Sequence, residues 1–261
     1  MIYIPTLGRW SHIETMLSLE NVYVNITLVV QPHEEANYRQ LWDSSRVTIK
    51  VLPEEVKGIA RTRQWIIDNA PENKIIFMDD DIKFARRKEK GSVKLTKVTR
   101  EDMCELMEWM YCQLEAYPVV GVSMRQGNNN HESSVSYNGQ CIRVVGLDLA
   151  KLRQHGVRYD VIDMMSDRHI VLSMLELGYP NIITNEWSQD HGGSNTSGGC
   201  SVDRTPAVLA ASAHKLAELH PGVVKIVQKE ENSGWWEGGR VDTVVYWKKA
   251  YKKGVENYGQ R

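Results

Sequence analysis

The segment KIIFMDDDI, residues 74–82, constrains this chain most, because an apolar run ends abruptly in three consecutive aspartates. A short apolar run bounded by polar residues is typical of a buried strand. Unpaired charge is costly to bury, so carboxylates that follow such a strand indicate a ligand. In an open α/β sheet, ligands bind outside the carboxyl ends of the strands. We therefore expect a binding site at this position.

Three adjacent carboxylates repel one another unless a cation lies among them. Oxygen ligands suit Mg²⁺ or Mn²⁺, and Mg²⁺ is usually held by one or two carboxylates together with substrate phosphates. Asp79, Asp80 and Asp81 are therefore expected to present a divalent metal to a nucleotide phosphate. The alternatives are a solvated acidic turn and a helix N-terminus, which attracts carboxylates.

Composition is that of an ordinary globular protein. The 261 residues suffice for one large α/β domain or two small ones, and the 42% hydrophobic content supports a packed core. A formal net charge of -1 argues against attraction of the whole protein to nucleic acid, but it is compatible with a local basic patch. Four cysteines without a C-x-x-C pair indicate cytoplasmic thiols. No apolar stretch reaches the length of about 20 residues that a membrane helix needs.

Strand-like and helix-like segments alternate in the first part of the chain. We expect strands at residues 2–4, 22–30, 47–51 and 74–78, and helices at 32–42 and 58–70. This βαβαβ rhythm predicts a mostly parallel, doubly wound sheet. Further along, we expect helices at 101–117, 148–155, 167–177 and 205–220, the last with Pro206 in its first turn after a Thr205 cap. Strands are expected at 119–124, 141–145, 181–187, 223–228 and 241–247.

Residues 83–100 carry eight basic side chains against the single acid Glu89. Such a run is either a flexible solvated loop or a grip on a polyanion, because Lys and Arg contacts to phosphate dominate nucleic-acid affinity. The phosphates could belong to an acceptor or to a nucleotide donor. A second basic run lies at residues 248–253. The candidates for acceptor contact are Arg86, Arg87, Lys88 and, in the polar loop 125–130, Arg125.

Three further features have both a functional and a structural interpretation. Asp167, near Asp163, is either a helix N-cap or a general base close to the metal. His191, in the glycine-rich segment 188–205, is either a metal ligand or polar surface, and this segment matches no standard phosphate-binding or dinucleotide motif. Trp235 and Trp236 either stack on a sugar or flipped base, or form a hydrophobic lid.

The segment IIFMDDDI, preceded by IYIPTLGR and GIARTRQWIID, resembles nucleotide-sugar glycosyltransferases of the GT-A type. In that family a DxD motif at a strand end holds the donor diphosphate through Mn²⁺ or Mg²⁺. Three later segments resemble bacteriophage DNA-modifying glycosyltransferases, including a TET-associated group that adds sugars to hydroxymethylated pyrimidines in DNA. These segments are RYDVIDMMSDRHIVLSMLELGYPNIIT, QDHGGSNTSGGCSVDRT and AHKLAELHPGVVKIVQK. The resemblance covers about residues 1–250.

The resemblance implies roles for individual residues. Asp79 and Asp81 match the ends of DxD and would bind the metal and the donor, with Asp80 between them. His191 falls where many GT-A enzymes place a metal-binding histidine. Asp167 matches the catalytic base, although Ser166 stands where a glutamate often precedes it. The residues that would hold the uridine or the diphosphate of the donor are Thr6, Gly8, Arg9, Arg61 and Arg63.

The same resemblance implies a single GT-A-like domain over residues 1–261, with a nucleotide-binding half at 1–82 and an acceptor-binding half at 83–261. Its mostly parallel central sheet would be accompanied by a short additional sheet and a C-terminal helix. The expected reaction is metal-dependent, inverting transfer from a nucleotide-sugar, expected to be a UDP-sugar, to a hydroxymethylated pyrimidine in DNA. The target base must be flipped out or single-stranded. The expected location is the cytoplasm, with no membrane association and no obligate protein partner.

Three alternatives stay open at this point. The same fold could act on a glycan, lipid or protein acceptor. A metal-dependent nucleotidyltransferase also places acidic residues at strand ends, but it would release pyrophosphate. An inactive nucleic-acid-binding module is the third, and the clustered aspartates argue against it because negative charges weaken DNA binding.

Overall fold

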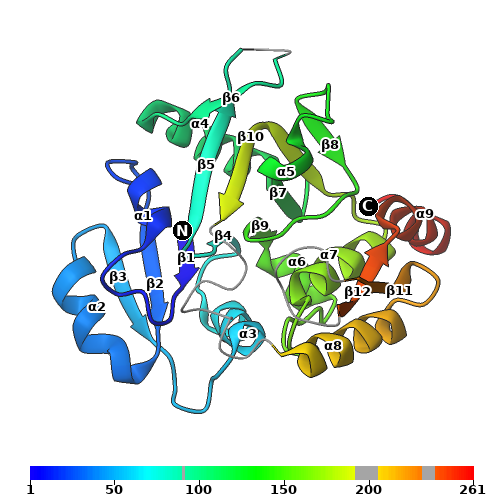
Figure 1. The fold of residues 1–261 in the computed structure, drawn as a ribbon, viewed down its shortest axis with the longest axis horizontal. Coiled ribbons are helices and arrows are strands. Elements are labelled where there is room, and N and C mark those ends of the chain that lie inside the picture. The colour runs from blue at the N-terminus through cyan, green and yellow to red at the C-terminus, as the bar shows by residue number, and fades with distance from the viewer. Residues whose placement is uncertain (90–91, 192–204, 231–238) are drawn as a thin grey trace.

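The structure is a computed structural model that describes residues 1–89, 92–191, 205–230 and 239–261. Trp235 and Trp236, together with most of the glycine-rich segment, lie outside the described residues. One ten-stranded sheet runs through the described part in the order β3-β2-β1-β4-β9-β7-β10-β5-β6, with β8 paired to β10, and β11 and β12 form a second sheet (Figure 1).

The strands span Ile2–Pro5 (β1), Ile26–Val30 (β2), Val47–Val51 (β3), Lys74–Met78 (β4), Ile82–Arg87 (β5), Leu95–Lys97 (β6), Val119–Met124 (β7), Val135–Tyr137 (β8), Val144–Asp148 (β9), Ile182–His191 (β10), Val224–Lys229 (β11) and Arg240–Val245 (β12). The helices span Glu14–Ser18 (α1), Pro32–Glu34 (η1), Glu35–Trp42 (α2), Ile59–Asn69 (α3), Arg100–Gln113 (α4), Arg125–Asn128 (α5), Leu149–Gln154 (α6), Ser166–Glu176 (α7), Pro206–Leu219 (α8) and Trp247–Tyr258 (α9).

The first half of the sheet is parallel, as the alternating pattern predicts. Strands β3, β2, β1 and β4 pair in parallel, and β1 and β2 are buried along their whole length. Strands covered on both faces read as continuous apolar runs, which is why the sequence shows them clearly. Strand β2 begins at Ile26 rather than at residue 22, because the N–H groups of Val22 and Val24 bond to carbonyls within the preceding turn.

The second half of the sheet mixes directions. Strand β9 pairs antiparallel with both β4 and β7, and β7 pairs in parallel with β10. The carboxyl ends of β1, β4 and β10 therefore meet at one edge. Strand β10 extends to His191, beyond the expected end at residue 187, because its register shifts between Thr184 and Ser188 and its last part pairs with β5. The predicted α/β class, with a small second sheet and a C-terminal helix, is confirmed.

The basic segment is a β-hairpin rather than a loop, so the interpretation of residues 83–100 as a flexible loop is wrong. Strands β5 and β6 pair through Ala85–Lys97, Arg86–Thr96 and Arg87–Leu95. Ile82 and Phe84 are buried whereas Lys83 is exposed, as expected for a strand with one covered face. The many lysines and arginines of this segment hid the alternation of buried and exposed positions in the sequence. Strand β8 was not expected either.

Helix starts follow the capping rules in most places. Thr99 and Asp102 form a capping box on α4, Asp148 caps α6, and Thr205 caps α8 with Pro206 at the first turn, as predicted. Helix α7 is different, because its N-cap is Met165 in the left-handed conformation, with φ 61° and ψ 17°. The N-cap interpretation of Asp167 is therefore wrong.

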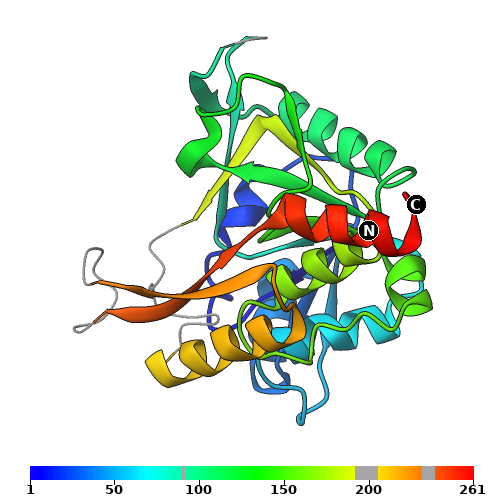
Figure 2. The ribbon, with the colours of Figure 1, turned by 90° about the vertical axis from the view of Figure 1, so that its right-hand side faces the viewer.

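Helix α7 is packed tightly against its neighbours. A Cβ added to Gly254 of α9 would lie 2.1 Å from the Leu175 carbonyl oxygen, so only glycine allows this approach. Strands β11 and β12 project from the body as a hairpin beside α8 (Figure 2). Among the described residues, no helix is both long and apolar enough to cross a membrane.

A buried polar relay ties α7 to α8 and α9. Nδ1 of His169 lies 2.8 Å from Nε2 of His220, whose Nδ1 donates to Glu176 at 2.5 Å. Glu176 also pairs with Lys253 at 2.7 Å. Desolvation, together with the nearby His220, lowers the pKa of His169 to about 4, although Glu176 acts in the opposite direction. The relay therefore favours an uncharged His169.

This relay predicts a loss of stability in acid. The pKa of His169 is lowered in the folded state. Its contribution to the free energy of unfolding is therefore complete above the pKa of the unfolded chain, about 6.5, and is lost as pH falls toward 4. The expected decrease in unfolding free energy is about 3 kcal/mol, measured by urea denaturation between pH 7 and pH 4. His169→Gln should flatten this dependence, whereas His214→Gln, at an exposed position of α8, should not. An unchanged slope in His169→Gln would contradict the assignment.

Candidate active site at the carboxyl edge of the sheet

The buried side chain of Thr15 holds the backbone of the aspartate segment. Its hydroxyl donates to the Asp79 carbonyl oxygen at 2.6 Å and accepts from the Ile82 N–H at 2.9 Å. The Thr15 N–H donates to the Asp80 carbonyl, and the Asp79 N–H donates to the carbonyl of Arg143 at 2.9 Å. These bonds fix the backbone, so the three carboxylates leave it in set directions.

Two arginines offset the repulsion among the aspartates. Arg9 forms an ion pair with Asp80 and lies 3.1 Å from Asp81. Asp80 also accepts the Thr6 hydroxyl at 2.7 Å. Arg63 donates to Asp79 at 2.6 Å. From the sequence, a bound metal was expected to balance the negative charge of the aspartates. In the structure, two arginines of the protein already balance part of that charge.

Arg63 also brings Asp167 into the site. The guanidinium Nη1 donates to Asp167 Oδ1 at 2.6 Å, while Nη2 holds Asp79 Oδ1 at the same distance. The Arg63 side chain is only 4% exposed and lies against the rings of Phe77 and Tyr159. A planar guanidinium can join two carboxylates in this way because its donors form a rigid fork. Asp167, in the first turn of α7, is thus fixed beside the DxD segment.

The crowded edge changes the acidity of its carboxyl groups. Desolvation raises the pKa of Asp79 to about 6 against the opposing charge of Arg63, and Asp167, Asp81 and Asp80 raise it further. Desolvation also raises the pKa of Asp80, against Arg9 and Thr6. Such shifts in a cluster of carboxylates are typical of functional sites.

A preorganised polar wall lies on the β1 side of the aspartates. The Gly8 N–H, at φ 70°, donates to both carboxylate oxygens of Glu34 at 2.9 and 3.1 Å. The Tyr38 hydroxyl lies 2.9 Å from the Thr6 hydroxyl and accepts from the Arg9 N–H. Desolvation raises the pKa of Tyr38 to about 12, so it acts as a neutral hydroxyl. The structure places Thr6, Gly8 and Arg9 in one wall beside Asp80.

Glu34 and Tyr38 were missed by the sequence analysis. Both are buried although they lie in a segment rich in polar residues. Their spacing of four places them on one face of η1 and α2. This spacing was the available signal, but a single buried Glu–Tyr pair on a short helix is not distinctive.

The residues at this edge fit a divalent metal. His191 is paired in register with Ile82, directly after Asp81, and the Asp81 side chain is 29% exposed. Carboxylate oxygen and imidazole nitrogen suit Mn²⁺ or Mg²⁺, and phosphate and water commonly complete the coordination. Within the described residues, no group of three or more His, Cys, Asp or Glu side chains is arranged to hold a metal ion. The assignment of Asp79, Asp81 and His191 as metal ligands stays a prediction, since Asp79 turns one oxygen to Arg63 and Asp81 turns one to Arg9.

Two of the basic residues expected to contact an acceptor make internal contacts. Arg86 pairs with Asp102 at 2.5 Å and with Glu105 at 2.6 Å, and it lies over the Trp187 ring. Arg87 is buried and donates to the side chain and the carbonyl of Asn128. These contacts hold β5 against α4 and α5, so both arginines have structural roles.

Lys88, Arg125 and Arg61 are more accessible. Lys88 is exposed on β-hairpin residues 82–97, and Arg125 lies 3.9 Å from Asp190, which precedes His191. Arg61 is 60% exposed and reaches Asp163 at 4.0 Å, so it does not join Arg63 at the aspartates. Arg63 therefore lies at the aspartates and Arg61 does not, and contact of either arginine with the donor phosphates stays a prediction.

The residue after Asp167 anchors the projecting hairpin. Arg168 donates to Asp242 at 3.1 Å and to the Thr243 hydroxyl at 2.6 Å. Burial would raise the pKa of Asp242, but hydrogen bonds from Lys229 and the Thr243 N–H, together with Arg168, lower it to about 2. The hairpin that leads to Trp235 and Trp236 is thus connected to the helix that carries Asp167.

The chain has recognisable relatives. A family model described as TET-Associated Glycosyltransferase matches residues 1–198. The beta-glucosyl-HMC-alpha-glucosyl-transferases of Enterobacteria phages T2 and T6 are 28% and 27% identical over 192 residues. Each match covers 68% of this chain and 66% of the relative, which is slightly less than two thirds of its length.

A solved structure shows the same fold. TarS of S. aureus, residues 1–349 in complex with UDP-GlcNAc, superposes with a TM-score of 0.50 at 9% sequence identity. The superposition covers 83% of this chain and 66% of that chain.

The pairing of Arg63 with both Asp79 and Asp167 predicts that loss of this arginine destabilises the protein in a pH-dependent way. Arg63→Met leaves Asp79 and Asp167 close together without their shared cation, so unfolding free energy should fall by about 3 kcal/mol at pH 8. At pH 5 the loss should be smaller, because the raised pKa of Asp79 lets this carboxyl take up a proton. Urea denaturation at both pH values measures the effect, with exposed Arg61→Met as the control. Equal losses at pH 5 and pH 8 would argue against a shared cation.

Proposed function

Because the chain belongs to the TET-associated glycosyltransferase family, we propose that it transfers a sugar from a nucleotide-sugar, specifically a UDP-sugar, to a hydroxymethylated pyrimidine base in DNA. Its family makes it a glycosyltransferase. The names of the two phage relatives, which refer to hydroxymethylcytosine, support the DNA acceptor. The TarS complex, in which a similar fold holds UDP-GlcNAc, supports the nucleotide-sugar donor.

One observation carries the proposal: Arg63 joins Asp79, at the expected donor site, to Asp167, the candidate base. A general base must lie within reach of the attacking hydroxyl, and the attacking hydroxyl must lie close to the donor sugar. Asp167 Oδ1 is occupied by Arg63, while Oδ2 has no hydrogen-bond partner within the described residues and the side chain is 20% exposed. Asp167 can therefore accept a proton while Arg63 holds it in place.

In the proposed step, Asp167 Oδ2 takes the proton of the hydroxymethyl group. The oxygen of that group forms a bond to the anomeric carbon, and the bond from this carbon to the diphosphate oxygen breaks. The leaving nucleoside diphosphate keeps the electron pair. Thr6, Gly8 and Arg9 would position the nucleotide, and the backbone held by Thr15 keeps the site rigid. A single displacement inverts the anomeric configuration.

A divalent cation, Mn²⁺ or Mg²⁺, would be held by Asp79, Asp81 and His191. When bound, it would offset the negative charge that develops on the leaving diphosphate. Arg9, which contacts both Asp80 and Asp81, lies in position to contribute in the same way. Its guanidinium is a fixed cation suited to phosphate oxygens.

The reaction is tested by a screen of nucleotide-sugars with Mn²⁺, single- and double-stranded DNA, and nucleoside mass spectrometry. Acceptors carry cytosine, hydroxymethylcytosine, hydroxymethyluracil or β-glucosylated hydroxymethylcytosine. We expect a hexose-sized gain on a hydroxymethylated base, and its loss in Asp81→Ala. Donor turnover without transfer to DNA would favour a glycan, lipid or protein acceptor, and release of pyrophosphate would favour a nucleotidyltransferase. NMR of the product tests inversion, because retention of the donor configuration would exclude a single displacement.

The role of Asp167 is tested separately. Asp167→Asn keeps the shape and one hydrogen bond to Arg63 but removes the base, so kcat should fall by about 10²- to 10⁴-fold. Asp163→Asn removes an equal charge nearby, from a side chain that is 73% exposed, and should leave kcat unchanged. Binding of UDP, measured by calorimetry, should change little in either variant. Unchanged turnover in Asp167→Asn would exclude it as the base.

A further inference from the structure

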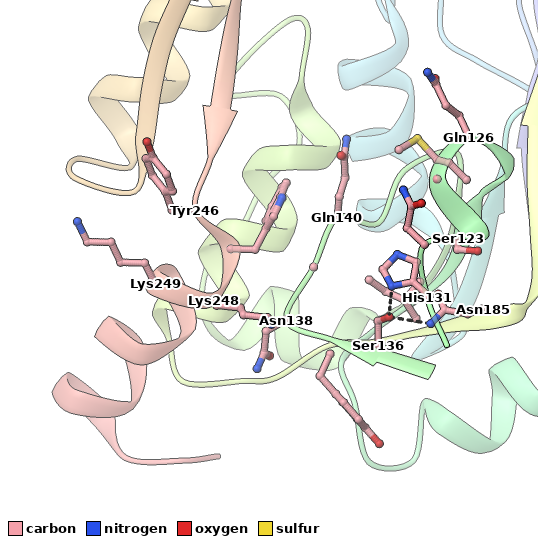
Figure 3. A pocket seen from close by; sticks show the side chains of 17 residues that line it. Ser123, Gln126, His131, Ser136, Asn138, Gln140, Asn185, Tyr246, Lys248 and Lys249 are labelled. Atoms are coloured by element: carbon pink, nitrogen blue, oxygen red, sulfur yellow. Dashed lines mark hydrogen bonds between the residues drawn. The ribbon is translucent and has the colours of Figure 1, made fainter. Parts of the chain in front are cut away.

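A second concave surface lies away from the aspartates, between α5, β8 and the start of α9. This pocket has a volume of about 920 Å³ and is large enough for more than one nucleotide. Figure 3 shows labelled side chains of the 123–140 segment on one side of it and Tyr246 and Lys249 on the other. Neither the proposed base nor the metal ligands belong to its lining.

The chemistry of this pocket is unlike that of the catalytic edge. Its lining contains no carboxylate side chain within the described residues and has two cationic ones, Lys248 and Lys249. Both lysines are exposed and form no ion pair within the described part of the chain, whereas Lys252 and Lys253 of the same helix pair with glutamates. The pocket therefore has a free positive charge.

Flat aromatic surfaces and carboxamides complete the lining. Tyr137 and Tyr246 are 48% and 46% exposed, so their rings offer stacking surfaces. Asn185 is fully buried, and its Nδ2 donates to the Ser133 carbonyl and the Ser136 hydroxyl. Its Oδ1 has no hydrogen-bond partner within the described residues. A buried acceptor without a partner is costly, so Asn185 is a constrained residue in the wall of the pocket.

The pocket and the candidate active site lie on the same strand. Asn185 at the pocket and His191 at the aspartates are six positions apart on β10. Strand β10 is not extended over this interval, because Thr184 pairs with Val122 of β7 and Ser188 pairs with the next residue, Ser123. The two sites are therefore closer than six extended residues would place them, and a few stacked nucleotides, at about 3.4 Å each, would bridge them.

We propose that this pocket binds a nucleotide of the acceptor DNA strand a few positions from the modified base. The base of this nucleotide stacks on Tyr246 and Tyr137, and its phosphate contacts Lys248 and Lys249. This inference rests on the proposed function, since it assumes that the acceptor is DNA. It also assigns DNA contact to the basic residues of α9 rather than to Arg86 and Arg87, whose donors are engaged internally.

Another pocket, which lies along the β5–β6 hairpin, is less suited to DNA. It includes Arg86, Arg87 and Lys88, but four carboxylates also line it, from Glu89, Asp102, Glu132 and Glu186. These carboxylates oppose the approach of phosphate. The absence of such groups in the larger pocket is the reason for preferring it.

DNA binding by the full chain tests the proposal, with a fluorescent single-stranded 20-mer and anisotropy at several salt concentrations. Lys248→Gln/Lys249→Gln should weaken binding and reduce the slope of log K against log salt by about 1 to 2, because two phosphate contacts are lost. Lys252→Gln, on the same helix but outside the pocket, is the charge control. Tyr246→Ala should weaken binding about tenfold, whereas Tyr246→Phe keeps the ring and should bind normally.

Two further readouts separate this proposal from the proposed function. UDP binding and donor hydrolysis without DNA should be unchanged in every pocket variant. In the transfer assay, KM should rise when the DNA that flanks the modified base is shortened until it no longer reaches the pocket, and flanks on both sides are shortened in turn. If wild-type protein modifies DNA but the pocket variants bind and transfer normally, the pocket proposal fails while the function stands. If wild-type protein neither binds nor modifies DNA, the proposed function fails and the pocket proposal fails with it.

Discussion

The structure depends on how four carboxylates are held at one edge of a sheet. Asp79, Asp80, Asp81 and Asp167 would repel one another in a region of low dielectric, and unpaired charges there cost several kcal/mol. Arg9 and Arg63 offset this repulsion, because each guanidinium contacts two carboxylates. The same two contacts arrange the site, since one arginine joins the aspartates to the β1 loop and the other joins them to α7.

Helix α7 connects this arrangement to the C-terminal part of the fold. Three consecutive residues reach three different parts of the fold: Asp167 to Arg63, Arg168 to the β11–β12 hairpin, and His169 to His220 of α8. The left-handed Met165 directly before the helix sets its direction. Non-glycine residues in this conformation are strained by about 1 kcal/mol or more and persist where surrounding contacts hold them, often near functional sites. The candidate base is therefore fixed by the packing of two other helices.

The parallel and the mixed parts of the sheet support different parts of the surface. Parallel strands β1 to β4 end at the wall that would hold the nucleotide, while strands β7, β8 and β10 of the mixed part support both the edge at His191 and the amide-rich pocket. Strand β10 belongs to both, because its register shift after Thr184 lets it pair first with β8 and then with β5. One strand therefore carries both the edge at His191 and one side of the pocket.

Local patterns in the sequence determined the parallel strands, most helix boundaries, the position of the aspartates at a strand end, and the family. Those features depend on short apolar runs, helix caps and motifs, which can be recognised from a few neighbouring residues. Tertiary structure alone decided that the basic segment is a hairpin with Arg86 and Arg87 paired internally, that Arg63 rather than Arg61 joins the site, and that Glu34 and Tyr38 support the β1 loop. Each of these outcomes is a contact between segments far apart in the chain, and the partner of a charged side chain cannot be read from its neighbours in sequence. The free energy of burying a charge depends on that partner, so only the folded arrangement could separate the arginines that hold the site from those that hold the fold.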